Sequence, residues 1–231
     1  FQNSVGVLGR LGALDVFDKP LVHALGACTS AVVFNSHSAD GELMHARNFD
    51  FPGVAVWDKS PTIVYCSPDH GIPYGYLGAR GADVPGITAF NAEGITVTVH
   101  TRFHRDVDFA ATGVIDLGHE IISQARTIND AIDIVSRHKV ASTWGIVVTS
   151  AKEKNAAIIE TTAKKMRVTW ARDGYLGNTN HYQHPDMVQG EIATSNGWTS
   201  YTVDRLRLLD KFFAEMQAKG GATLTDMQHI L

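Results

Sequence analysis

Short runs of β-branched residues, or of alternating hydrophobic and polar residues, fill the first half of the chain. They cover residues 29–36, 42–48, 62–67, 87–91 and 95–101. Asp40-Gly41 between the first two runs is a strong hairpin signal, and Ala92-Glu93-Gly94 supplies a turn between the last two. Runs of period two joined by tight turns predict an antiparallel sheet.

Helical spacing of hydrophobic residues appears after this sheet, at residues 113–125 and 128–138, with Thr127 or Asn129 available as an N-cap between the two helices. A period of two returns at residues 144–150, 156–162 and 165–171, and an amphipathic helix follows from about Thr202 until Gly220-Gly221. Strands, two helices, strands and then helices predict an α+β fold in which helices cover the outer faces of two stacked antiparallel sheets.

Composition narrows the possible partners. The 231 residues are 44% hydrophobic and 19% charged, with a formal net charge of -4, so no basic field favours nucleic acid or an anionic membrane surface. No apolar run reaches the roughly 20 residues that span a bilayer, and the first residues lack the pattern of a signal peptide. We expect a soluble protein, either cytoplasmic or exported with a removed leader. The sequence leaves its oligomeric state open, including a homo-oligomer.

The stretch around Cys28 carries the candidate chemistry. A lone cysteine is most often buried packing, but Gly26-Ala27 precede Cys28, and Arg47, Asn48 and Asp50 lie at the far end of the partner strand. A hairpin that turns at Asp40-Gly41 brings this end back beside Cys28. A cation next to the sulfur favours the thiolate, which is the reactive form of cysteine.

A cysteine nucleophile usually needs a base, and the sequence offers two solutions. Eleven histidines are candidates, although Cys28 does not lie in a papain-like sequence setting. The other solution is cleavage of the Ala27-Cys28 bond, which frees an α-amine on Cys28 that takes up the thiol proton. In that case Asp50 would hold the ammonium group and Arg47 the thiolate.

The stretch CTSAVVFNSHSADGELMHARNFDFPG resembles the N-terminal-nucleophile cysteine hydrolases, through Cys-Thr-Ser followed by Arg47-Asn48-x-Asp50. It is similar above all to the acyl-coenzyme A:6-aminopenicillanate acyltransferase (isopenicillin-N N-acyltransferase) group, and to acid ceramidase, penicillin V acylase and choloylglycine (bile salt) hydrolase. The resemblance implies a four-layer αββα sandwich that is made as a zymogen and cuts itself before the cysteine. Residues 1–27 are then the end of a propeptide, and residues 28–231 the hydrolase domain, which we expect to be truncated at its C-terminus.

The resemblance also implies roles for individual residues. Cys28 is the nucleophile, Arg47 orients thiolate and substrate, Asp50 pairs with the α-amine, Asn180 helps form the oxyanion hole, and Arg205, rather than its competitor Arg207, is a further active-site arginine. The Asn-x-x-Gly turn of these families corresponds to Asn91-Ala92-Glu93-Gly94, and the following strand places His100 or Thr101 near a second oxyanion or substrate contact. We therefore include Asn91, His100 and Thr101 in the predicted site.

Three functions remain open from sequence. The first is an autoprocessing amidohydrolase or N-acyltransferase that acts on a non-peptide N-acyl amide through an acyl-Cys28 thioester, with water, an amine or an acyl-coenzyme A as co-substrate. The second is a His-assisted, papain-like cysteine hydrolase, and the third is an inactive relative that binds ligands. We expect no cofactor and no metal, since His181 and His184 lack carboxylates at matching spacing.

Overall fold

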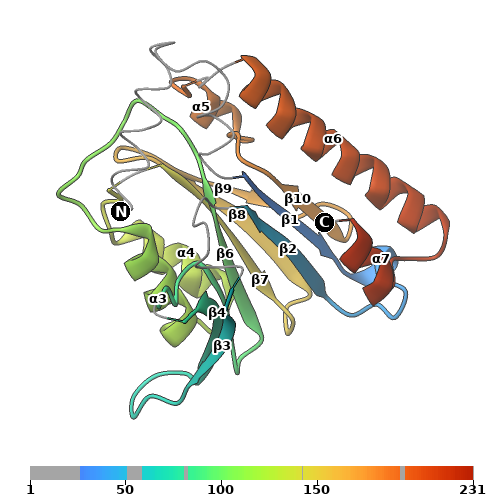
Figure 1. Ribbon diagram of the computed structural model, residues 1–231, viewed down its shortest axis with the longest axis horizontal. Helices are drawn as coiled ribbons and strands as arrows, with labels where there is room; N and C mark the ends of the chain where they lie inside the picture. The colour runs from blue at the N-terminus through green and yellow to red at the C-terminus, as the bar shows by residue number, and fades with distance from the viewer. Residues whose placement is uncertain (1–26, 51–58, 81–82, 142, 193–195, 231) are drawn as a thin grey trace.

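The computed structural model describes residues 27–50, 59–80, 83–141, 143–192 and 196–230. Within these ranges the strands form two antiparallel sheets, which lie face to face with helices outside them (Figure 1). The predicted propeptide end lies outside the described residues except for Ala27. The four layers confirm the predicted α+β sandwich.

The smaller sheet has the strand order β10-β1-β2 and holds the predicted Cys28 hairpin. Its strands are β1 (Ala27–Val33), β2 (Met44–Asp50) and β10 (Tyr175–Asn178), and the 3-10 helix η1 (Asn35–His37) lies in the connection from β1 to β2. The outer face of this sheet is covered by α6 (Asn196–Ala218) and α7 (Leu224–His229). The short helix α5 (Pro185–Val188) follows β10.

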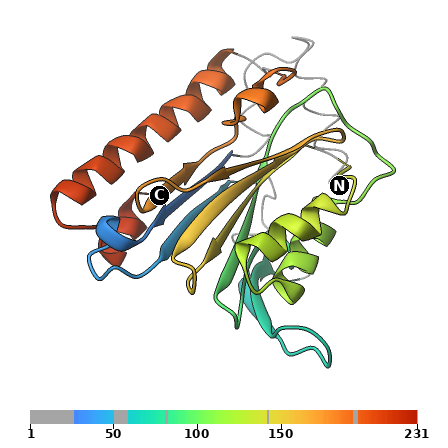
Figure 2. The ribbon, with the colours of Figure 1, turned by 180° about the vertical axis from the view of Figure 1, so that it is seen from behind.

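The larger sheet has the order β3-β4-β5-β6-β7-β8-β9. Its strands are β3 (Pro61–Cys66), β4 (Tyr74–Ala79), β5 (Thr88–Asn91), β6 (Ile95–Thr101), β7 (Trp144–Ser150), β8 (Asn155–Thr161) and β9 (Met166–Trp170). Figure 2 shows its outer face covered by α3 (Val114–Gln124) and α4 (Ile128–Ser136). Helix α4 begins at a capping box in which Thr127 and Asp130 exchange hydrogen bonds, which decides between the two predicted N-caps.

Strand alternation divides the core into three apolar layers. In β6, Ile95, Val97 and Val99 pack against α3 and α4, whereas Thr96, Thr98 and His100 face the smaller sheet. Strands β7 and β8 are buried along nearly their whole length because helices cover one face and the smaller sheet covers the other. By contrast, the face of β6 that meets β1 carries polar side chains, which is unusual for a position between two sheets.

Strands β4 and β10, the short helices η1 and α5, and the start of α6 differ from the sequence prediction. Strands β4 and β10 were not predicted, because each is short and interrupted by glycine, which weakens the strand signal. Helix α6 begins at Asn196, before the predicted start near Thr202, and ends before Gly220, whose φ of 92° requires glycine-like freedom.

Candidate active site

The β1–β2 hairpin places the predicted nucleophile beside its predicted partners. In its register Cys28 lies opposite Phe49, Ser30 opposite Arg47, and Ala27 opposite Asp50. Directly opposed residues in an antiparallel pair share a face, so the hairpin gathers both flanks of the Ala27-Cys28 bond against the Arg47–Asp50 segment. The predicted pairing of these two segments is confirmed.

The Arg47 guanidinium spans the space between the two sheets. Its Nη2 donates to the carbonyl oxygen of Val99 at 2.7 Å and to Sγ of Cys28 at 3.6 Å. Its Nη1 donates to the carbonyl oxygen of Ile87 at 2.8 Å and to Oγ1 of Thr88. The carbonyl and hydroxyl acceptors fix the cation in one orientation, so that its charge is held at the sulfur.

Asn180 reaches Cys28 from the segment that follows β10. The backbone N–H of Cys28 donates to Oδ1 of Asn180 at 2.8 Å, and Nδ2 of Asn180 donates to the carbonyl oxygen of Thr101 at 3.1 Å. The amide is almost completely buried, and the backbone N–H of Asn180 donates to Oγ1 of Thr202 at 2.8 Å. Nδ2 carries two hydrogens, and the bond to Thr101 uses only one of them.

Arg205 contacts the site, and Arg207 does not. Nη1 of Arg205 donates to the carbonyl oxygen of Cys28 at 2.8 Å and to Oγ1 of Thr29 at 2.7 Å, while Nη2 donates to Oδ1 of Asn180 at 2.9 Å. The side chain of Arg207 is 75% exposed and pairs with Asp204, one turn away on the same helix. Thr29 is a contact that sequence reasoning missed, because its part in the site depends on where α6 lies.

Asp50 lies at the exposed end of β2. Its Oδ2 accepts a hydrogen bond from Nδ2 of Asn48 at 3.1 Å, and its backbone pairs with Ala27. Asp50 thus lies opposite the residue that precedes Cys28, and its pairing with an α-amine stays a prediction.

Asn91 does not join this group. Its Nδ2 donates to the carbonyl oxygens of Ile122 and Ala125, and its Oδ1 accepts from the backbone N–H groups of Glu93 and Ile95. All four hydrogen-bonding positions of the amide are therefore used to hold the β5–β6 turn against the end of α3. The structure assigns Asn91 to this turn and not to the substrate site.

His100 and Thr101 take different positions at the site. Thr101 contributes its carbonyl oxygen to Asn180. His100 is fully buried, and its Nε2 lies 2.9 Å from Oγ of Ser30 and 3.3 Å from Oγ1 of Thr98. Burial, together with the nearby guanidinium groups of Arg47, Arg102 and Arg205, holds the pKa of His100 well below its usual value.

His45 is a second histidine among the polar side chains between the two sheets. The sequence did not predict that His45 lies there. Nε2 of His45 lies 3.2 Å from Oγ of Ser30, and its Nδ1 lies 2.7 Å from Oγ1 of Thr96. Burial, with a smaller effect of the Arg47 charge, lowers the pKa of His45 to about 3. His45 and His100 are therefore neutral at ordinary pH, and their hydrogen bonds lead to Ser30.

The histidines in the described part of the chain do not supply a base for Cys28. Arg47 is the side chain there that hydrogen-bonds to Sγ, and His45 and His100 are engaged with Ser30. His181 and His184 bond to nearby threonines and to the backbone of α5, respectively. Across the described ranges, no three His, Cys, Asp or Glu residues are grouped as a metal ion would require.

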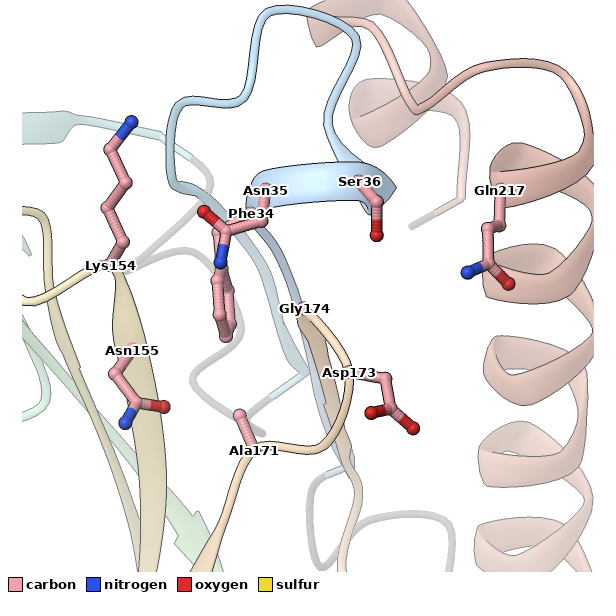
Figure 3. Close-up of a pocket in the computed structure, with 9 residues that line it drawn as sticks. All are labelled: Phe34, Asn35, Ser36, Lys154, Asn155, Ala171, Asp173, Gly174 and Gln217. Carbon is pink, nitrogen blue, oxygen red and sulfur yellow. The ribbon is translucent and has the colours of Figure 1, made fainter.

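A polar pocket of about 600 Å³ lies at the opposite end of β1 from Cys28 (Figure 3). Turns at the ends of β1, β7 and β9 form it together with α6; the lining residues are Phe34, Asn35, Ser36, Lys154, Asn155, Ala171, Asp173, Gly174 and Gln217. Phe34 lies six residues after Cys28 along extended chain, a separation of roughly 20 Å. This pocket is therefore distinct from the Cys28 site.

No helix in the described ranges is long and apolar enough to cross a bilayer.

The sequence matches the family model described as acyl-coenzyme A:6-aminopenicillanic acid acyl-transferase over residues 37–227. This range contains Arg47, Asp50, Asn180 and Arg205 and begins after Cys28. No curated protein sequence matches the chain.

Solved structures share the fold. An N-acylethanolamine-hydrolyzing acid amidase ortholog from Caenorhabditis elegans has a TM-score of 0.66 at 17% identity, over 88% of this chain and 85% of that one. A variant of the conjugated bile acid hydrolase from Clostridium perfringens has a TM-score of 0.59 at 9% identity, over 87% of this chain and 77% of that one.

Proposed function

Because this chain belongs to the acyl-coenzyme A:6-aminopenicillanic acid acyl-transferase family, we propose that it is a self-processing cysteine hydrolase or acyltransferase. Its substrate is a non-peptide N-acyl amide, and the intermediate is a thioester at Cys28. The observation that carries this proposal is the donation of a hydrogen bond from Nη2 of Arg47 to Sγ of Cys28 at 3.6 Å. A guanidinium held in this position stabilises a thiolate.

Self-processing begins when the thiol of Cys28 attacks the carbonyl carbon of Ala27. The peptide C–N bond breaks, and the acyl group moves to sulfur while the nitrogen becomes the free α-amine of Cys28. Water then opens the thioester, which leaves a carboxylate on Ala27 and a thiol on Cys28. Cys28 becomes the first residue of the mature domain, and Asp50, opposite Ala27 in the hairpin, accepts a hydrogen bond from the new ammonium group.

In the mature enzyme the α-amine takes the thiol proton, and the thiolate attacks the substrate carbonyl. The second hydrogen of Asn180 Nδ2 donates to the oxygen that becomes negatively charged. The ammonium group returns the proton to the leaving amine as the C–N bond breaks, and the acyl-Cys28 thioester remains. Water completes hydrolysis, and an amine in its place completes acyl transfer. Throughout the reaction Arg205 donates hydrogen bonds to the carbonyl oxygen of Cys28 and to the amide oxygen of Asn180, and so keeps the two residues in fixed positions.

The test of the proposed function has two stages. In the first, the chain with its natural upstream sequence is produced as wild type, as Cys28→Ala and as Cys66→Ala, and the intact masses are compared. We expect cleavage between Ala27 and Cys28 in the wild type and in Cys66→Ala, because Cys66 lies in β3, outside the site, but not in Cys28→Ala. An uncleaved wild type overturns the self-processing step.

In the second stage the cleaved protein is assayed with an N-acylethanolamine, a conjugated bile acid and an N-acyl derivative of 6-aminopenicillanic acid. The first two compounds follow from the names of the similar solved structures and the third from the family. We expect release of the amine from at least one compound and none with Cys28→Ala. No release from any of them contradicts the proposed substrate class.

A further inference from the structure

A buried ion pair lies behind the segment that carries Asn180. Arg102 follows β6, Glu160 lies in β8, and both side chains are completely inaccessible to solvent, with Nε of Arg102 3.7 Å from Oε1 of Glu160. Burying two charges is costly unless their remaining donors and acceptors are satisfied. The side-chain hydrogen bonds of this pair go to one short stretch of chain, residues 178–184, while Nε of Arg102 has only its contact with Glu160.

The guanidinium of Arg102 holds the residues just before Asn180. Its Nη2 donates to Oδ1 of Asn178 at 2.5 Å, and its Nη1 donates to the carbonyl oxygen of Thr179. Gly145 in β7 makes room for this group, because a Cβ atom at that position would lie 2.7 Å from Nη2 and 2.9 Å from Cζ of Arg102. The glycine is thus a requirement of the buried guanidinium.

The carboxylate of Glu160 holds the residues just after Asn180. Its Oε1 accepts from the backbone N–H of Gln183 at 2.7 Å, and its Oε2 accepts from that of His184 at 2.8 Å. Glu160 lies directly opposite Gly145 in the β7–β8 ladder, so the cation and the anion meet on one face of the larger sheet. A single ion pair therefore fixes the backbone on both sides of Asn180.

We propose that Arg102 and Glu160 are positioning residues which set the place of the Asn180 amide beside Cys28, an inference that rests on the function proposed above. The side-chain hydrogen bonds of the two residues in the described ranges do not include Cys28. The two residues act through the 178–184 backbone, which is also held by the ladder pairing of Asn178 with Ser30, by the bond from the Asn180 N–H to Thr202 and by that from the Tyr182 N–H to Glu191. A displacement of about 1 Å at a reacting group costs on the order of a hundredfold in rate.

The test uses Glu160→Gln, which keeps the size of the side chain but replaces one acceptor oxygen by an NH₂ group and removes the charge that faces Arg102. We expect kcat to fall at least about tenfold while KM changes less than about threefold, because the interaction lost is one made in the transition state. In an Asn180→Ala background the same substitution should change kcat by less than about twofold, since its effect passes through the amide that is already absent.

Two further variants separate positioning from general loss of stability. Gly145→Ala displaces the guanidinium without removing a charge, and it should reproduce the fall in kcat. Ile121→Val shortens a fully buried side chain in α3, on the far side of the larger sheet, and should lower the melting temperature while kcat per folded molecule stays unchanged. If Glu160→Gln and Ile121→Val behave alike at matched loss of stability, the positioning role is overturned.

A readout that needs no substrate distinguishes failure of this inference from failure of the proposed function. Amide hydrogen exchange at Gln183 and His184 should accelerate at least about tenfold in Glu160→Gln and remain unchanged in Ile121→Val. If the wild type is inactive but Glu160→Gln accelerates this exchange, the proposed function is refuted and the anchoring of the segment by Glu160 stands. An active wild type in which the exchange does not respond, or in which the Asn180 and Glu160 effects are additive, refutes the inference alone.

Discussion

Replacing Arg205 by lysine, with Arg207→Lys as the matched control, tests whether the end of α6 organises the Cys28 site. Both substitutions keep the positive charge and lie two residues apart on the same helix. Arg205 donates three hydrogen bonds, to the Cys28 carbonyl, the Thr29 hydroxyl and the Asn180 amide oxygen. Arg207 is mostly exposed and pairs with Asp204 alone.

The expected size of the effect follows from these contacts. The planar fork of Arg205 spans three acceptors on three different residues, whereas a lysine ammonium is a single point that reaches one or two of them. Each lost hydrogen bond to a charged donor is worth about 1.5–3 kcal/mol. Loss of two of them would therefore raise the activation free energy by at most about 3–6 kcal/mol. Relaxation recovers part of this energy, and we expect kcat/KM to fall by about 10² to 10³, since about 1.4 kcal/mol is tenfold.

The assay is steady-state hydrolysis of the preferred N-acyl amide by cleaved protein, with the extent of cleavage measured by intact mass for each variant. Arg207→Lys should stay within about twofold of the wild type, because an exposed ion pair contributes at most about 1 kcal/mol to stability and touches nothing in the site. Equal activities of Arg205→Lys and Arg207→Lys, in proteins that are both cleaved and folded, would refute the role assigned to Arg205.

Three further predictions concern stability. The pKa of His45 is lowered to about 3 from a usual 6.5, so between these values the unfolded chain binds a proton that the folded chain does not. We expect His45→Gln to remove roughly 2–3 kcal/mol of the destabilisation that urea titrations should detect between pH 7 and pH 4.5, since each pH unit below the unfolded pKa contributes about 1.4 kcal/mol. An unchanged pH dependence would contradict this. Gly118→Ala should lower the free energy of unfolding by roughly 2 kcal/mol, because its Cβ would lie 2.2 Å from the Gly86 carbonyl oxygen, and an unaltered melting temperature would show that α3 moves freely. Thr127→Ala should cost about 1 kcal/mol by breaking the capping box with Asp130, a loss that Thr127→Ser should largely avoid.

Local signals predicted the part of the site that lies within one hairpin. Asp40-Gly41 marks the turn, and strict alternation then determines which residues face each other, so the pairing of Cys28 with the Arg47–Asp50 segment follows from the sequence. Strand β10 carries no comparable signal. Its four residues become a strand because β1 offers an unpaired edge, which is a tertiary cause.

Helical phase explains why Arg205 and not Arg207 enters the site. Arg205 lies four residues before Leu209 and eight before Phe213, and both of these pack against the smaller sheet. A period of 3.6 therefore places Arg205 on the covered face of α6, whereas Arg207 lies off it. The spacing was present in the sequence and supports the choice of Arg205.

Asn91 and the Arg102–Glu160 pair show what one sequence cannot convey. The Asn-x-x-Gly pattern at Asn91 reflects a turn whose amide is saturated by α3 and the turn backbone, and no feature of the sequence separates this role from a catalytic one. Arg102 and Glu160 are far apart along the chain, and their meeting depends on the ladder that joins β6, β7 and β8.

The most direct test of the central claim is to locate the acyl group during turnover. The cleaved enzyme is mixed with a saturating N-acyl amide, quenched in acid within milliseconds to seconds, digested and mapped by mass spectrometry. We predict one acyl group on the peptide that begins at Cys28, labile to hydroxylamine as a thioester is, and none on the Cys66 peptide. Turnover without an acylated Cys28 peptide, or with the peptide still joined to Ala27, would show that Cys28 is not an N-terminal nucleophile.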